Sequence, residues 1–409
     1  MGSNKSIEKQ WRDFLMDLLN EKNLIKKTWE ITEFLQKESY NVDKDNRFPY
    51  EGINLLKEHG FMGLIIPKEF GGLGHNIKVA SKVVQILASG CLSTSMIFGM
   101  HCQQVMTVIN HAKKELKASL LEEIAIKRWY IASVTSEKEK GGHLLTANSP
   151  LKWNSDYHFG LHRDAPIVTG GSEADAFLIT VKKDTDSLAS KVLLVYANRD
   201  ELDVELQGSW ASMGMRGTQS VSMSLDANLN KDNILTIEDF KIVAQETLIP
   251  TGHIMWVSSW LGATKGIYRK IITLLRNGKI NKKAVKESEL LYYRLSKTRL
   301  LIDTVDIYLE KIVNEYTNIL KESNKEKFKS YEFNIHLNNL KILGSENLFK
   351  AVDEMVNIAG LKLGYLQNNE IPLERVFRDL RAASLMYHND RLKLANGKIS
   401  LFSSNLLGE

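Results

Sequence analysis

Apolar residues recur at helical spacing in two stretches near the start of the chain, from about Trp11 to His59 and from Lys78 to Arg128. Between these stretches, the glycines and the proline of residues 60–74 interrupt any helix and allow tight turns. This part of the chain is therefore expected to be helical, with one sharp connection in it.

The pattern changes from about Ile131 to Phe240. Short alternating or β-branched runs, such as Ala176–Val181 and Lys191–Tyr196, are separated there by Gly, Asp and Asn. After Gly252 the helical period returns and continues almost to the end of the chain, which predicts a bundle of long helices.

These patterns predict a mainly α fold with a central β domain. The N-terminal helical domain is expected at residues 1–130 and a β-barrel or β-sandwich domain at 131–245. A C-terminal four-helix bundle is expected at 246–409.

Composition and charge exclude several classes of partner. The net charge of +5 is the small difference between 54 basic and 49 acidic residues, so it gives no support for nucleic-acid binding. No apolar run is long enough to cross a bilayer, and no membrane partner is expected. Two cysteines, Cys91 and Cys102, form neither a disulfide framework nor a metal-ligand spacing. We therefore expect a cytoplasmic protein without a bound metal.

Five short strings, in this order, resemble those of the acyl-CoA dehydrogenase superfamily. They span most of the chain, and their order is more specific than any single one. The strings are Gly60–Gly74, Ile131–Glu137, Thr169–Asp175, Met213–Thr218 and Pro372–Asp379. For the first and the last of them, maintenance of the fold is at least as good an explanation as contact with a ligand.

The resemblance implies a homodimeric or homotetrameric flavoprotein with FAD between the β domain and the bundle. Its implied reaction is α,β-dehydrogenation of an acyl thioester, carried by coenzyme A or by an acyl or aminoacyl carrier protein. Such a site needs a flavin in a dry cleft, donors on the thioester oxygen and a carboxylate as base.

The resemblance places Val134 and Thr135 along the flavin ring and Thr169 near its N5 atom. Ile167 stands where the family often has an aromatic residue, so it provides an apolar wall in place of a stacking partner.

Three glycine or amide positions are expected to reach the rest of the cofactor. Gly142 lies in a Gly-Gly-His turn whose backbone could approach a phosphate, although a surface turn explains it equally well. Asn357 and Gly360 belong to a segment that matches the family's cofactor-binding string in part, with altered spacing.

The base is the largest departure from the family pattern. Counting from the Arg-Asp string, the family's usual base position holds Tyr387, and the alternative position on the first bundle helix holds Trp256. Neither is a carboxylate. Trp256 is expected to pack in the core or to form the floor of the substrate pocket. The departures favour a specialised biosynthetic substrate.

Three explanations for the missing carboxylate remain open. A displaced base such as His388, Asp390 or His253 could remove the proton. Alternatively, the protein is a flavin monooxygenase of this fold, with His101 and His388 facing the flavin or the substrate from two sides. The third possibility is a non-catalytic member of the fold. Ordinary hydrogen-bonded histidines would explain His101 and His388 as well, and a helix cap would explain Asp390.

Overall fold

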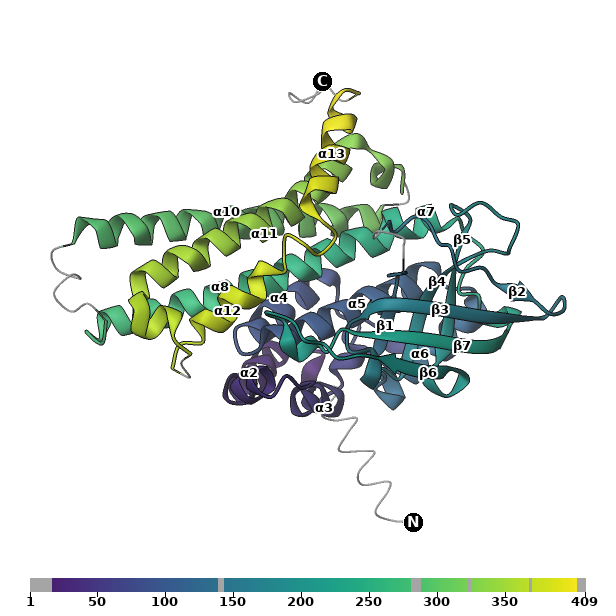
Figure 1. Ribbon diagram of the computed structural model, residues 1–409, viewed down its shortest axis with the longest axis horizontal. Helices are drawn as coiled ribbons and strands as arrows, with labels where there is room; N and C mark the ends of the chain where they lie inside the picture. The colour runs from purple at the N-terminus through teal and green to yellow at the C-terminus, as the bar shows by residue number, and fades with distance from the viewer. Residues whose placement is uncertain (1–16, 139–142, 281–287, 323–324, 368–369, 403–409) are drawn as a thin grey trace, which may run out of the picture.

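The computed structural model describes residues 17–138, 143–280, 288–322, 325–367 and 370–402. N-terminal helices come first along the chain, two β-sheets follow, and long helices complete it (Figure 1). The predicted mainly α fold with a central β domain is confirmed.

Side chains cap the start of two N-terminal helices. Asn20 accepts hydrogen bonds from the first backbone N–H groups of α2, and Asn76 accepts one from Val79 in α4. The helices of this part are α2 (Glu21–Lys44), α3 (Tyr50–Glu58), α4 (Ile77–Ala88), α5 (Leu92–His111) and α6 (Lys114–Lys127).

The predicted sharp connection lies between α3 and α4. Gly60, Gly71 and Gly74 all have a positive φ there, and a side chain on Gly72 would overlap the carbonyl of Ile66. The glycines of this string are therefore needed for the course of the backbone.

The central domain contains two small sheets. One has the order β1 (Ile131–Val134), β4 (Ala176–Lys182), β5 (Val192–Asn198), with β1 and β4 parallel. The other has the order β2 (Lys152–Trp153), β3 (His158–Val168), β7 (Val221–Asn230), β6 (Asp203–Gln207) and is antiparallel. The pairing of β3 with β7 shifts between Ala165 and Val168, so the end of β3 bulges away from the ladder.

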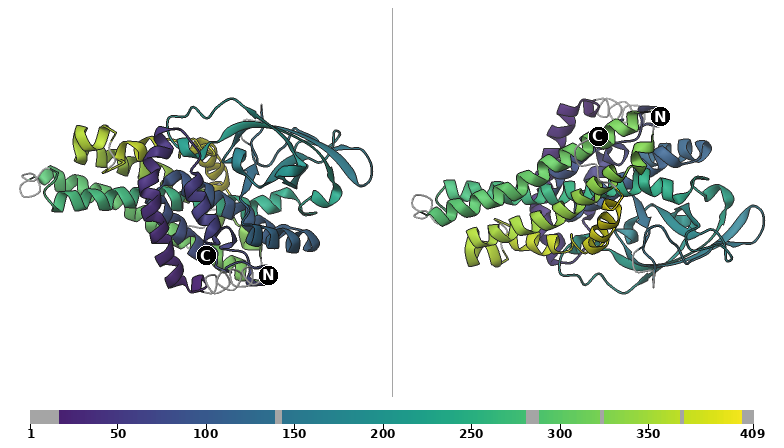
Figure 2. Two further views of the ribbon diagram at one scale, coloured as in Figure 1. Left: turned by 90° about the horizontal axis from the view of Figure 1, so that it is seen from below. Right: turned by 90° about the horizontal axis from the view of Figure 1, so that it is seen from above.

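Three long helices, α8 (Ile249–Arg276), α10 (Glu289–Lys321) and α11 (Tyr331–Gly360), extend away from the sheets in the described part of the bundle (Figures 1 and 2). The shorter helices are α7 (Phe240–Val243), α12 (Leu373–Arg381) and α13 (Asn389–Ser400). Ser288 caps α10 and Ser330 caps α11. Within the described residues, no helix combines the length and the apolar character needed to cross a membrane.

Short helical turns connect these elements. Among the residues that the structure describes, two segments have π geometry, η7 (Ala244–Leu248) and η9 (Leu361–Tyr365). The 3-10 turns are η1 (Phe61–Gly63), η2 (Lys68–Phe70), η3 (Gly171–Glu173), η4 (Arg199–Glu201), η5 (Arg216–Thr218), η6 (Lys231–Asn233) and η8 (Lys325–Lys329).

Helix α8 packs closely against both α4 and α5. Gly262 of α8 lies against the backbone of Gln85 in α4, where a Cβ atom would overlap it. On the α5 side, Ser259 shares a hydrogen bond with Ser95 at 3.3 Å. Small residues allow this approach and give a dense core between the N-terminal helices and the bundle.

Candidate functional site

The first half of the candidate site is an edge of the β domain. Val134 is fully buried at the end of β1, and its carbonyl accepts a hydrogen bond from Thr180 at 3.3 Å. Thr135 follows it and is only partly buried. Of the two residues that the sequence placed along a flavin, Thr135 therefore has the accessible side chain.

The bulge at the end of β3 brings Ile167 to this edge. The Ser136 hydroxyl donates to the Ile167 carbonyl at 2.7 Å and accepts from the Ile167 N–H at 3.3 Å. Ile167 is 52% exposed, which is unusual for isoleucine, and it adds an apolar surface to the edge that Ser136 belongs to.

Thr169 heads a chain of hydroxyl groups that reaches the bundle. Its Oγ1 shares a hydrogen bond of 3.1 Å with Ser220, which shares one of 2.9 Å with Thr218. The Thr218 hydroxyl donates to the Met215 carbonyl, and the Met215 N–H donates to the carboxylate of Asp379 in α12. The chain fixes the β edge relative to the helix that leads to Tyr387.

A buried ion pair supports this edge from inside. Arg163 of β3 is fully buried, and its guanidinium lies 2.7 Å from the carboxylate of Glu137. Glu137 also accepts from the backbone N–H groups of Asn148 and Ser149. The pair connects the segment after β1 to β3.

The second half of the site is a group of rings on the bundle. The ring centroid of His253 in α8 lies 5.7 Å from that of Trp256 and 6.0 Å from that of Tyr387. The connection from α12 to α13, which carries Tyr387, lies at the end of the bundle next to the sheets (Figures 1 and 2). The structure thus brings together Trp256 and Tyr387, the two residues at the family's base positions.

Two features of these rings are typical of a binding site. Tyr387 has a φ of 47°, a conformation that costs free energy in a bulky residue. The indole N–H of Trp256 is buried and has no acceptor among the described residues. A buried donor without a partner is rare in proteins, so a bound molecule would be expected to accept from it.

None of these three rings can act as a strong base near neutral pH. Burial, with a smaller contribution from the nearby Lys341, lowers the pKa of His253 to about 3. Burial raises the pKa of the Tyr387 phenol, which therefore stays protonated. The bundle face accordingly offers hydrogen-bond donors and apolar ring surface.

A buried lysine lies beneath Tyr387. The ammonium of Lys341 in α11 donates to the side-chain oxygen of Asn389 at 2.7 Å and lies 3.5 Å from the Tyr387 carbonyl oxygen. Burial lowers the pKa of Lys341 to about 8. The lysine thus contacts the residues on both sides of His388, the Tyr387 carbonyl and the Asn389 side chain.

The carboxylate of this network is Glu346. Its oxygen accepts from the amide of Asn389 at 3.0 Å and lies 2.7 Å from the ammonium of Lys393. Burial raises the pKa of Glu346, but these donors outweigh burial and hold the pKa below its usual value. Glu346 is thus ionised and paired.

His388 and Asp390 lie apart from the rings. The side chain of His388 is 51% exposed and that of Asp390 is 81% exposed, and the two groups are 3.5 Å apart. These two residues therefore form an exposed pair next to the buried cluster.

His101 is enclosed in the core. The Ile131 N–H donates to its Nδ1 at 3.2 Å, so Nε2 carries the proton and donates to the Met62 carbonyl at 2.9 Å. Burial lowers its pKa to about 4, which keeps the ring neutral. Both nitrogens are engaged by backbone groups, which favours the structural interpretation of this histidine over contact with substrate.

The remaining predicted cofactor residues lie elsewhere. Asn357 and Gly360 are exposed at the C-terminal end of α11, at the end of the bundle away from the sheets (Figure 1). The Asn357 carbonyl accepts from Arg294 at 3.1 Å. Gly142 lies outside the described residues.

Sequence reasoning missed Lys341 and the network around it. A signal was present, because Lys341 lies on the same helical stripe as Leu337, Ser345 and Leu348, all of which are buried. A lysine in a buried stripe needs a partner, and Asn389 is that partner here.

Comparisons with known proteins show what this chain is similar to. Residues 24–127 match the family described as "Acyl-CoA dehydrogenase, N-terminal domain". A Bacillus subtilis (strain 168) protein named "Probable acyl-CoA dehydrogenase" is 23% identical over 383 residues, covering 89% of this chain and 62% of that protein. Dibenzothiophene monooxygenase of Rhodococcus qingshengii is 22% identical over 219 residues, covering 52% of each. The chain thus matches less than two thirds of the length of either relative.

The same fold is found in a solved structure. FMN-bound TdsC from Paenibacillus sp. A11-2 has a TM-score of 0.83 at 17% identity, covering 92% of this chain and 96% of that one. These similarities support a place for the chain in the acyl-CoA dehydrogenase superfamily, whose N-terminal domain residues 24–127 match.

Proposed function

We propose that the protein is a flavin-dependent monooxygenase. The observation that carries this proposal is the replacement of the family's carboxylate by the Tyr387 phenol, which lies among rings and donors. A superfamily relative named as a monooxygenase supports the proposal. The sequence alone favoured dehydrogenation of an acyl thioester and left monooxygenation as the alternative. The order of the two is reversed in this proposal.

In this proposal, a flavin ring lies between the two halves of the site. The β edge offers the Thr135 and Thr169 side chains and the exposed apolar surface of Ile167. The bundle offers the buried indole N–H of Trp256, which has no acceptor among the described residues. A reduced flavin supplies the electrons for inserting one oxygen atom of dioxygen into a substrate and releasing the other as water.

The protein's own groups would bind the substrate and exclude water. The rings of His253 and Trp256 would provide an apolar wall, and the neutral phenol of Tyr387 would donate a hydrogen bond to the substrate. Lys341 and Asn389 hold the strained backbone at Tyr387, so the donor keeps its position. No proton has to be taken from carbon in this reaction, so no carboxylate is needed.

Dehydrogenation of an acyl thioester is the second candidate. The exposed His388 and Asp390 pair, with 3.5 Å between the two groups, is the observation that favours it, because this pair follows the family's base position directly. In that case His388 would take the proton and Asp390 would stabilise the charged imidazole. A coenzyme A thioester or an acyl carrier protein would be the partner, and a biosynthetic role would follow.

Whether the cofactor is FAD or FMN is linked, in this proposal, to whether the protein forms a dimer or tetramer. Asn357 and Gly360 lie at the end of the bundle away from the sheets, so they would contact the far part of an FAD held by a second subunit (Figures 1 and 2). FAD therefore implies a dimer or tetramer, whereas FMN would leave these two residues without a role in cofactor binding. Flavin released by denaturation distinguishes the two cofactors by chromatography.

One experiment separates the two reactions. Reduced flavin is supplied by NADH and a flavin reductase under labelled dioxygen, with small aromatic heterocycles such as dibenzothiophene as substrates, and product mass is measured. Labelled oxygen in the product is the expected result. Bleaching of the bound flavin by an acyl-CoA thioester without oxygen would overturn monooxygenation in favour of dehydrogenation, and a purified protein that binds no flavin would contradict both.

A further inference from the structure

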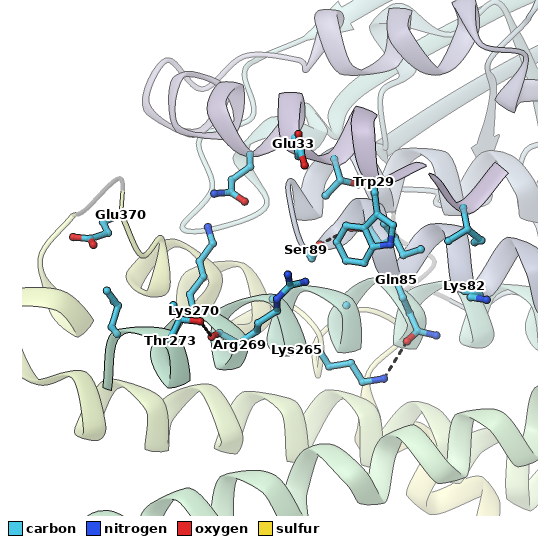
Figure 3. A pocket seen from close by; sticks show the side chains of 17 residues that line it. Trp29, Glu33, Lys82, Gln85, Ser89, Lys265, Arg269, Lys270, Thr273 and Glu370 are labelled. Carbon is cyan, nitrogen blue, oxygen red and sulfur yellow. Dashed lines mark hydrogen bonds between the residues drawn. The ribbon is translucent and has the colours of Figure 1, made fainter. Parts of the chain in front are cut away.

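A large cavity lies away from the ring cluster, between α2, α4 and the C-terminal half of α8 (Figure 3). Its volume is about 1080 Å³, which is ample for a ligand of nucleotide size. Thr169, Trp256 and Tyr387 do not line it. The candidate functional site therefore does not account for this cavity.

Close helix packing forms the floor of the cavity. A Cβ atom on Gly262 would overlap the backbone of Gln85, and one on Gly266 would lie 2.9 Å from the Cβ of Ser89. The glycines let α8 lie directly against α4. The cavity opens above this contact, where α2 stands away from α8 (Figure 3).

Cations of α8 line one wall. Lys265 is already paired with Asp306 at 2.6 Å. Lys270 has no carboxylate within ion-pair distance in the described part of the chain, and burial together with Arg375 lowers its pKa to about 8. A partly buried ammonium without a counter-ion is costly, and an anionic ligand would relieve that cost.

The opposite wall supplies an aromatic ring and an acceptor. Trp29 of α2 is 40% exposed and lines the cavity, with the guanidinium of Arg269 lying 5.7 Å from its ring centroid. Glu33, also of α2, lies across the cavity from Lys270 (Figure 3). A carboxylate there can accept hydrogen bonds from sugar hydroxyls or an exocyclic amine.

We propose that this cavity binds a phosphorylated nucleotide. Lys270 and Arg269 would hold the phosphates, because both lie on the same wall and are cations. Trp29 would stack on the base, and Glu33 would accept from the ribose. A simple phosphate would leave the tryptophan and the carboxylate unused.

The test is ADP binding to the full-length protein saturated with flavin, so that any flavin site is occupied. Calorimetry is expected to detect saturable ADP binding, weakened at least tenfold by Lys270→Gln. Trp29→Leu is expected to weaken ADP binding and to leave pyrophosphate binding unchanged. Lack of ADP binding at millimolar concentration, or equal affinity for ADP and pyrophosphate, would overturn the proposal.

Two further variants guard against indirect effects. Lys114→Gln removes the same charge from an exposed position on α6, outside the cavity, and is expected to bind ADP like the wild type. Lys270→Arg keeps the cation and is expected to retain most of the affinity. If Lys270→Gln unfolds, as judged by circular dichroism, Arg269→Gln tests the same wall, and unchanged ADP binding by it would overturn the phosphate assignment.

Discussion

Lys341 donates a hydrogen bond to Asn389 at 2.7 Å, and this contact joins the middle of α11 to the first residue of α13. Both side chains are buried. Tyr387, which stands at the family's base position, lies two residues before Asn389 and has its carbonyl oxygen within 3.5 Å of the same ammonium. The buried lysine thus determines where the connection between α12 and α13 lies.

Lys341→Met should change how stability depends on pH. The pKa of Lys341 is about 8 in the folded protein and 10.5 in an unperturbed lysine, so the unfolded chain binds the proton more tightly between these values. Because of Lys341, the free energy of unfolding of the wild type should therefore rise by about 3 kcal/mol as pH rises through that window, and Lys341→Met should lack this rise. Thermal unfolding of both proteins between pH 7 and pH 10.5 measures the difference.

The control for this prediction is Lys350→Met. Lys350 is exposed on the same helix, so its removal should leave the wild-type pH dependence intact. Identical pH profiles for Lys341→Met and the wild type would contradict the role of burial at Lys341.

Tyr387→Phe removes only the phenol oxygen. Because burial raises the pKa of Tyr387, the phenol is a donor over the whole neutral range, and its loss should lower turnover about tenfold or more. Flavin content should not change, since the ring remains in place. Steady-state oxygen consumption measures the turnover, and flavin absorbance measures the flavin content. Unchanged turnover would refute the role of the phenol as donor.

The order of the elements and the choice of site segments could be predicted from the sequence because both rest on local patterns. Helical spacing marks α5 and α8, and the glycines of residues 60–74 mark a turn. The structure brings the rings of Tyr387 and Trp256 next to that of His253, and their positions along the chain had marked both as replacements for the base.

Burial and pairing could not be read from the sequence. A histidine such as His101 is a catalytic candidate by its residue type. Its two ring nitrogens, however, form hydrogen bonds with the backbone of Met62 and Ile131, which are distant along the chain. His388 carries the same side chain and is half exposed. The difference depends on tertiary contacts, which helical periodicity does not encode.

Arg163→Met should destabilise the β domain strongly. The change leaves the buried Glu137 carboxylate without its cation, which typically costs about 3–5 kcal/mol. The double variant with Glu137→Gln should recover part of the loss, because no unpaired charge remains. Denaturant unfolding of the three proteins tests this, and a double variant less stable than Arg163→Met would contradict the ion-pair explanation.

Gly214→Ala should disrupt the contact between the β domain and α12. A Cβ atom there would overlap the carbonyl of Arg378, in the same place where Asp379 accepts from the Met215 N–H. Overpacking of this kind costs about 1–3 kcal/mol. Gly397→Ala is the matched control, because its Cβ would meet no atom and alanine favours the helix. Equal melting temperatures for the two variants would show that the backbone around Gly214 accommodates the extra methyl group, and would contradict this prediction.

Trp256→Phe tests whether the unpartnered indole N–H serves a ligand. In the flavin-free protein this group has no acceptor among the described residues, so its removal should leave the melting temperature unchanged or slightly higher. In the flavin-loaded protein, a lost hydrogen bond of about 1.4 kcal/mol should weaken binding of flavin or substrate about tenfold. Fluorescence titration with FMN and FAD, followed by substrate titration of the loaded protein, measures both affinities. If both affinities equal those of the wild type, no ligand accepts from Trp256, and the candidate site must be assigned without it.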